Sequence, residues 1–276
     1  VVAPTSQELK LDAYGKSITF YYTANTNVSY TVKYLDKDTN EQIADIKSVT
    51  GQTFNSSVTE TAIEITGYTV VAPTSQELKL DAYDKSITFY YTANEDVSYT
   101  VNYLEKDTNK VLATAKTVTG KTFNSSVTET AIEITGYTVV APTSQELKLD
   151  AYGKSITFYY TANTNVSYTV KYLDKDTNEQ IADIKSVTGQ TFNSSVTETA
   201  IEITGYTVVA PTSQELKLDA YDKSITFYYT ANTNVSYTVK YLDKDTNEQI
   251  ADIKSVTGQT FNSSVTETAI EITGYT

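Results

Sequence analysis

Short segments in which apolar and polar residues alternate recur throughout the chain. In residues 28–35, every second residue is Val or Tyr and most of the others are Ser, Thr or Lys, which is the period-2 pattern of a strand with one buried face. The polar run 36–40 predicts a turn, and residues 42–49 predict a returning strand. We therefore expect a β-hairpin that is closed by Gly51.

Two further strands are predicted over residues 67–72 and 86–91, because β-branched and aromatic residues dominate both segments. In the second strand the buried face holds Phe89 and the apolar residues two positions to either side. The side chain of Tyr90 should therefore point away from the core.

A short helix is predicted between the hairpin and these strands. Ser57 and Glu60 form a capping-box pattern ahead of the apolar residues Ala62, Ile63 and Ile65, which is compatible with one or two helical turns. The same Thr-rich and Ile-rich residues also suit an extended segment, and residues 73–77 suit either another helical turn or a loop. The expected fold class is therefore α+β, dominated by β-structure.

The whole pattern repeats every 69 residues, so the 276-residue chain holds four copies. The first and third copies are identical, and the fourth differs from them only at Asp222, whose counterparts are Gly15 and Gly153. This position lies in a predicted turn, where Gly and Asp both tolerate a left-handed backbone. The second copy varies mainly at positions equivalent to 36–52, which predicts that this stretch faces solvent.

The structural modules are predicted to begin inside these copies rather than at their first residues. A cut after residue 69 would bisect the strand predicted over 67–72, whereas the polar run 25–27 separates two strand signals as a linker does. We therefore predict complete modules at 28–96, 97–165 and 166–234, the C-terminal part of a module at 1–27, and the N-terminal part of another at 235–276. The incomplete ends should expose sheet edges and associate end to end between molecules.

Composition excludes several classes of function. The chain has no Cys and no His, which removes disulfides, thiolate metal sites and the usual general base. All 21 basic residues are Lys, and the net charge of −13 makes nucleic acids and anionic membranes poor partners. No apolar run approaches the about 20 residues of a membrane span. We expect any signal peptide of an exported protein to lie outside these residues. We expect no enzyme, no cofactor, no metal and no membrane insertion.

A set of motifs in fixed order carries a family resemblance. The motifs are the strand 30–34, the acidic turn 36–40, Thr50-Gly51, the segment 65–68 and the closing strand 86–91. In this order the unit resembles the mucin-binding-protein (MucBP-like) repeat of cell-wall-anchored surface proteins of Gram-positive bacteria. It departs from the commoner family turn, which has Gly where this chain has Thr39. The resemblance implies compact β-grasp-like modules, an extracellular location with the wall anchor outside this chain, and mucin glycan binding in some members.

Two patterns are candidates for ion binding or covalent chemistry. Residues 36–41 resemble the start of a calcium loop, because alternate oxygen side chains can converge on a hard cation. The Gly at the sixth position is missing and the second copy has Lys110 there, so a solvated turn is the favoured interpretation. A Lys–Asn isopeptide bond beside a buried acid, as in some wall-anchored adhesins, is the other candidate.

One aromatic position is a candidate for ligand binding. Tyr90 and its equivalents Tyr21, Tyr159 and Tyr228 should point outward, where a tyrosine ring can stack on a sugar. The favoured alternative is that a second layer of the fold covers them. No residue is assigned to a ligand on this basis.

The favoured function is a stalk that projects a terminal binding domain from the bacterial cell wall. The link between Ala24 and Val28 is too short and too poor in Gly for a flexible tether. Modules arranged end to end as an elongated rod would reach on the order of 120 Å or more, at roughly 30 Å for each unit. The alternative is that each module binds mucin or other host glycans directly and gains strength by multivalency.

Overall fold

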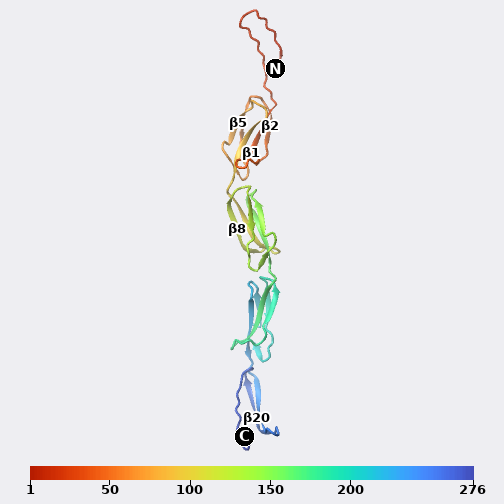
Figure 1. Ribbon diagram of the computed structural model, residues 1–276, viewed down its shortest axis with the longest axis vertical. Coiled ribbons are helices and arrows are strands. Elements are labelled where there is room, and N and C mark those ends of the chain that lie inside the picture. The colour runs from red at the N-terminus through yellow and green to blue at the C-terminus, as the bar shows by residue number, and fades with distance from the viewer. The chain divides into compact units, whose positions relative to one another are not determined.

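The computed structural model describes residues 1–276 and consists of β-strands connected by turns and loops, without a helix. Residues 28–96, 97–165 and 166–234 are called repeats 1, 2 and 3, and each contains six strands (Figure 1). The leading segment, residues 1–27, contains no strand, and the trailing segment, residues 235–276, contains two. The fold class is therefore all β, and the expected α+β class is wrong.

The strands of the three repeats correspond one to one. Repeat 1 contains β1 (Val28–Asp36), β2 (Lys47–Gln52), β3 (Ser57–Thr61), β4 (Tyr68–Val70), β5 (Ser75–Lys79) and β6 (Lys85–Ala93). Repeat 2 contains β7 (Val97–Glu105), β8 (Val111–Lys121), β9 (Ser126–Thr130), β10 (Tyr137–Val139), β11 (Ser144–Lys148) and β12 (Lys154–Ala162). Repeat 3 contains β13 (Val166–Asp174), β14 (Lys185–Gln190), β15 (Ser195–Thr199), β16 (Tyr206–Val208), β17 (Ser213–Lys217) and β18 (Lys223–Ala231). The trailing segment contains β19 (Val235–Leu242) and β20 (Gln249–Gln259).

The chain divides into two compact units. The first comprises residues 1–104, 113–131 and 141–158, and the second comprises residues 105–112, 132–140 and 159–276. This division runs through repeat 2, whereas repeats 1 and 3 each lie within one unit.

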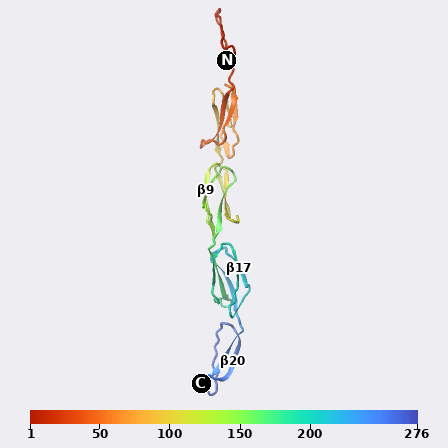
Figure 2. The same ribbon diagram turned by 90° about the vertical axis from the view of Figure 1, so that its right-hand side faces the viewer.

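Each repeat is built from two sheets. In repeat 1 the larger sheet has the order β2-β1-β6-β4, in which the central strands β1 and β6 run parallel and the outer strands pair antiparallel. Strands β3 and β5 form a separate antiparallel pair, with Val58 opposite Leu78. Repeat 3 has the same arrangement, β14-β13-β18-β16 and β15-β17, and Figure 2 shows the strand packets from a second direction.

The core lies under the two central strands of the larger sheet. On β1 the side chains at 28, 30, 32 and 34 are buried and alternate with partly exposed ones, as predicted. On β6 the residues Phe89 and Tyr91 are each 1% exposed, and the Phe89 ring stacks on Tyr34 with ring centroids 6.3 Å apart. Leu80 and the partly buried Val58 and Leu78 pack against this cluster. The predicted strands at 28–35 and 86–91 are therefore confirmed.

The predicted helix after Ser57 is wrong, because these residues form strand β3. Glu60 does not cap a helix, since its carboxylate is 8% exposed and accepts hydrogen bonds from Tyr30 and Lys47. The β-branched residues of this segment pair with β5, and the segment 62–65 then continues without helical structure. Residues 75–79 likewise form strand β5 in place of the helical turn or loop considered for this region.

The turns follow the sequence pattern with one correction. The hairpin prediction holds, but the returning strand β2 begins at Lys47 and not at residue 42. It also extends past Gly51, which lies inside it at φ +71° beside a bulge in the β1–β2 register. At the turn before β6, Asp84 and Asp222 adopt φ 55° and 57°, so the left-handed backbone expected there is confirmed. Most residues of the stretch 36–52 are exposed, as its variability predicted, but Asp36 at its start is buried.

The leading segment contains residues equivalent to the central strand β6, but it has no β1-type strand with which they could pair. Phe20 is 40% exposed and Tyr22 is 71% exposed, whereas their counterparts Phe89 and Tyr91 are 1% exposed. The same residues are therefore buried only where they pair with a strand equivalent to β1. No segment of the structure forms a helix able to cross a lipid bilayer.

Candidate functional site

A recurring contact joins each repeat to the next, and an aromatic ring stands at its centre. Phe123 of repeat 2 packs on Tyr68 of repeat 1 with ring centroids 5.5 Å apart, and on Tyr152 of its own repeat at 5.8 Å. The ring also lies against Gly67, where a Cβ would come within 2.3 Å of the ring carbons. Only glycine fits at that position, which also has φ +81°.

Asn94 connects the two repeats by hydrogen bonds. Its backbone N–H donates to the carbonyl of Gly67 at 2.9 Å, and its side-chain oxygen accepts from Thr69 at 2.7 Å. Its backbone carbonyl accepts from the N–H of Phe123 at 2.7 Å, and its side-chain nitrogen donates to the Tyr152 hydroxyl at 3.2 Å. One residue of the short linker is therefore bonded to both repeats at once.

The same contact is repeated further along the chain. Gly136, Asn163 and Phe192 occupy the equivalent positions between repeats 2 and 3, with the Phe192 N–H bonded to the Asn163 carbonyl at 2.8 Å. Gly205 and Phe261 make the equivalent contact between repeat 3 and the trailing segment. We call this contact the joint and define it by residues 67, 68, 94, 123 and 152 and their equivalents.

An ion pair between a half-exposed lysine and a largely buried glutamate ties the two sheets of each repeat together. The Lys47 ammonium on β2 donates to both carboxylate oxygens of Glu60 on β3 at 2.8 Å, and the Tyr30 hydroxyl on β1 donates to the same carboxylate at 2.7 Å. Burial opposes the charge of Glu60, but the hydrogen bonds from Lys47 and Tyr30 outweigh it and lower the pKa of Glu60. Burial and the Glu60 carboxylate raise the pKa of Tyr30 to about 12.

This arrangement differs from the isopeptide site considered from the sequence. The groups that meet are Lys47, Glu60 and Tyr30, whereas the candidate isopeptide bond would join Lys to Asn beside an acid. Lys47 and Glu60 are joined by hydrogen bonds at 2.8 Å, which favour the charged carboxylate and lower the pKa of Glu60. The triad therefore acts as a noncovalent link.

In the acidic turn after β1, the first carboxylate accepts hydrogen bonds from the backbone of the turn itself. Asp36 is 7% exposed, and its Oδ1 accepts hydrogen bonds from the backbone N–H groups of Asp38 and Thr39 at 2.8 and 2.9 Å. Asn40 completes the turn at φ 60°. This is the bonding of an Asx-type turn, and no group of three or more metal-ligating side chains occurs in the structure.

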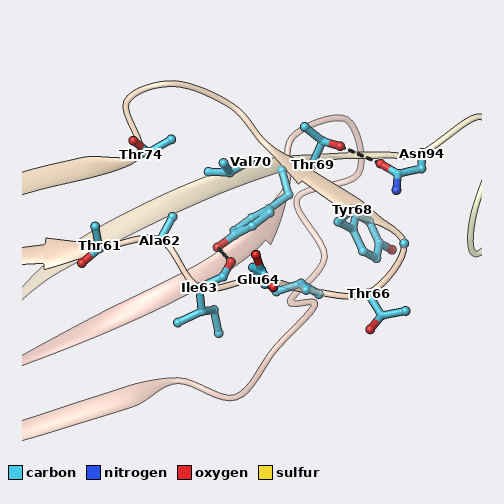
Figure 3. A pocket seen from close by; sticks show the side chains of 13 residues that line it. Thr61, Ala62, Ile63, Glu64, Thr66, Tyr68, Thr69, Val70, Thr74 and Asn94 are labelled. Carbon is cyan, nitrogen blue, oxygen red and sulfur yellow. Dashed lines mark hydrogen bonds between the residues drawn. The ribbon is translucent and has the colours of Figure 1, made fainter.

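A hollow of about 630 Å³ lies beside the joint in repeat 1 (Figure 3). The segment from Ala62 to Thr66 forms one wall and β4 forms the other, while the Tyr91 hydroxyl donates to the Ile63 carbonyl at 2.8 Å across the floor. The equivalent hollow in repeat 3 has a volume of about 560 Å³. In repeat 1 the polar groups that line the hollow are mainly threonines and Glu64. The lining includes neither a cationic side chain nor an exposed aromatic ring.

The outward tyrosines are exposed, and no second layer covers them. Tyr90, Tyr159 and Tyr228 are 42%, 39% and 41% exposed, so the prediction that they point away from the core is confirmed. In repeat 3, Tyr228 borders a cleft of about 340 Å³. The cleft is lined by Lys175, Asn178, Val209, Ala210, Pro211, Gln214, Thr226 and Tyr228.

Reasoning from the sequence missed the joint. The sequence shows that the linker is short, but Asn94 has no sequence feature that marks it as bonded to both adjacent repeats. The signal that was present is Gly67 followed by Tyr68, together with a Phe after each β2-type strand that fits no alternating pattern. These residues are far apart in sequence, so only the fold brings them together.

The family comparison agrees with these observations. The MucBP domain matches residues 30–92, 99–161, 168–230 and 237–276. The chain belongs to the MucBP family. MucBP repeats are non-enzymatic adhesion modules, and this chain is not an enzyme.

Listerial surface proteins are among the relatives of this MucBP chain. Internalin J of Listeria monocytogenes serotype 4b is 29% identical over 279 residues, which covers 95% of this chain and 29% of the relative. Internalin I of the same strain is 30% identical over 209 residues, 74% of this chain and 11% of the relative. The chain thus spans less than a third of either relative. It is a repeat region of the kind found in surface adhesins of Gram-positive bacteria.

Two solved structures give weaker similarity. The type 2 repeat of the mucus binding protein MUB from Lactobacillus reuteri is 17% identical, with 49% of this chain and all of that chain covered and a TM-score of 0.19. The Bacillus anthracis TIE protein is 9% identical, with 75% of this chain and 51% of that chain covered and a TM-score of 0.33.

Proposed function

We propose that this MucBP repeat region is a stalk, which holds a binding domain at a distance from the bacterial cell wall to which the full protein is anchored. The observation that supports this function is the joint. Four hydrogen bonds to Asn94 and one aromatic ring seated on a glycine oppose rotation between adjacent repeats. A spacer needs this property, because a freely rotating linker would let the chain fold back.

The proposal takes residues 28–96, 97–165 and 166–234 as the structural modules. In support, the core cluster of repeat 1 draws its members from Val28 to Tyr91, and the joint lies where one such segment follows another. We also propose a β-grasp-like module, in which the pair β3–β5 takes the place of the helix. The parallel central strands β1 and β6 support this relation.

The isolated polypeptide of residues 1–276 should also associate end to end. Its leading segment exposes Phe20 and Tyr22, whose counterparts are buried by a β1-type strand in the repeats. The trailing segment carries such a strand, β19, without a β6-type partner. Pairing between the two segments of neighbouring molecules would bury these rings.

The joint can be tested by measuring distances between spin labels. The chain has no Cys, so Lys79→Cys with Lys148→Cys places one label on each side of a joint at exposed sites. A stalk predicts a narrow distance distribution by pulsed electron paramagnetic resonance, which broadens when Phe123→Ala is added. The same broad distribution in both proteins would contradict the proposal.

Direct binding of host glycans is the competing function. It is favoured by the exposed tyrosine that recurs in each repeat, because aromatic rings are common in ligand contacts. Several weak sites on one chain would gain apparent affinity by multivalency. Glycan binding that strengthens with the number of repeats supports this function, whereas a pure spacer binds none.

A further inference from the structure

The strands with which a repeat begins and ends are parallel neighbours in the larger sheet. In repeat 1 the chain enters at Val28, the first residue of β1, and leaves at Ala93, the last residue of β6. Tension along the chain therefore pulls β1 and β6 in opposite directions along their length. We propose that the β1–β6 ladder and its equivalent β13–β18 keep the repeat folded under tension. This inference rests on the proposed stalk, because a chain that is held at both ends carries tension.

The ladder between β1 and β6 is continuous. Its register pairs seven consecutive residues, from Tyr30 opposite Lys85 to Asp36 opposite Tyr91. The backbone N–H of Lys37 donates to the carbonyl of Tyr91 at 2.8 Å and extends the ladder beyond the strand. Hydrogen bonds of a parallel pair are evenly spaced, so sliding one strand along the other strains all of them together. Peeling the strands apart from one end breaks the same bonds one after another and meets a lower barrier.

Both strands of the ladder lie inside the sheet and share a buried core. Strand β2 pairs with the outer side of β1 and β4 pairs with the outer side of β6, so neither β1 nor β6 is an edge strand. The Tyr34 ring of β1 lies 6.3 Å from the ring of Phe89 and 6.4 Å from that of Tyr91, measured between centroids. Sliding β1 along β6 must separate these rings as well as the backbones, which adds lost packing to lost hydrogen bonds.

The same ladder recurs in repeat 3. Strands β13 and β18 pair in parallel from Tyr168 opposite Lys223 to Asp174 opposite Tyr229. The N–H of Lys175 donates to the carbonyl of Tyr229 at 2.8 Å, as Lys37 does in repeat 1. In the trailing segment β19 pairs with β20 alone. Tension should therefore unfold the trailing segment before repeats 1 and 3.

The direction of pulling tests this proposal without weakening the fold. The chain has no Cys, so handles for single-molecule force spectroscopy can be attached to cysteines introduced into the full chain. Asn27→Cys with Thr92→Cys pulls the beginning of β1 against the end of β6 and shears the ladder. Asn27→Cys with Ser86→Cys pulls at the beginnings of both strands and peels the ladder open. All three sites are exposed, and the two proteins differ only in the attachment site on β6.

We expect repeat 1 to unfold at a force about two- to threefold higher in shear than in peeling at the same pulling speed, because forced unfolding follows the unfolding barrier. Each event should lengthen the tether by about 200 Å, the extended length of the residues between the handles less their folded span. Equal forces in the two directions, or a higher force in peeling, overturn the proposal. Neither outcome bears on the spin-label distances that test the stalk.

A matched pair of substitutions locates the resistance within the repeat. Val32→Ala shortens a side chain of β1 that is 0% exposed, and Val58→Ala makes the same change on β3, outside the ladder. Urea unfolding measures the loss of equilibrium stability in each variant. For a given loss of stability, Val32→Ala should lower the shear force more than Val58→Ala does. A loss of force that follows equilibrium stability equally in both variants overturns the assignment to β1 and β6.

Discussion

At the scale of single residues, burial and hydrogen-bond partners determine the role of the glutamate in strand β3 and of its counterparts. Glu60 and its counterpart Glu198 are 8% exposed, and each accepts hydrogen bonds from a lysine on one sheet edge and a tyrosine on the central strand. A buried charge is tolerated only when it is paired in this way. The residue that pattern reasoning assigned to a helix cap therefore links the two sheets.

The lowered pKa of these glutamates predicts acid sensitivity. A carboxyl group whose pKa is lower in the folded chain stabilises the fold above its unfolded pKa of about 4.3, and this contribution is lost as the pH falls through the folded pKa. The thermal midpoint should therefore fall steeply below about pH 4.5.

A matched variant isolates this effect. With Glu60, Glu129 and Glu198 all replaced by Gln, the chain should be less stable at pH 7 and should lose less stability on acidification. Calorimetry from pH 7 to pH 3 measures both quantities. An unchanged pH profile in the variant would show that other carboxylates cause the acid sensitivity.

At the scale of elements, the sequence pattern predicted the strands of the larger sheet, but it predicted neither the pair β3–β5 nor the arrangement of the sheets. The buried residues of β1 and β6 follow from period 2, and the left-handed turn at Asp84 follows from its exchange with Gly. The segment after Ser57 was mispredicted, because a capping box and a strand that pairs with β5 contain the same residue types. Local sequence cannot distinguish them, since pairing partners and burial decide the outcome.

The joint could not be predicted from local sequence either, because its residues come together only in the folded chain. Phe54 and Phe123 are followed by the same residues and preceded by similar ones, with Lys121 in place of Gln52, yet Phe123 is 8% exposed and lies on Gly67, while Phe54 is only partly buried. The exposed fractions of the two rings differ because only Phe123 packs on a preceding repeat. The Gly-Tyr pair that receives the ring precedes Phe123 by more than fifty residues and has no counterpart before Phe54.

This pair of rings gives an internal control for the strength of the joint. Each ring packs on a tyrosine of its own repeat, Phe54 on Tyr83 at 6.0 Å and Phe123 on Tyr152 at 5.8 Å between centroids. Replacing Phe123 by Ala should therefore reduce the free energy of unfolding by about 3 kcal/mol, and replacing Phe54 by about half as much. Urea unfolding of the two variants measures the difference, and equal losses would mean that the joint contributes no stability.

At the scale of the whole molecule, the same repeat and the same joint recur along the chain. Asn94, Asn163 and Asn232 each bond to the N–H of the phenylalanine that follows in the next copy, at 2.7 to 2.8 Å. Because these residues are the same at each joint, removing or adding one copy would leave a joint of the same composition. A surface protein built this way can change its reach through copy number alone.

The most direct measurement of this account is small-angle X-ray scattering of the chain at low concentration, where end-to-end association is suppressed. Fixed joints predict an extended particle with a maximum dimension on the order of 120 Å or more and a radius of gyration of about 35 Å. Phe123→Ala with Phe192→Ala should shorten the particle while the repeats stay folded. A radius of gyration of about 19 Å, the value for a compact chain of this length, would contradict the stalk.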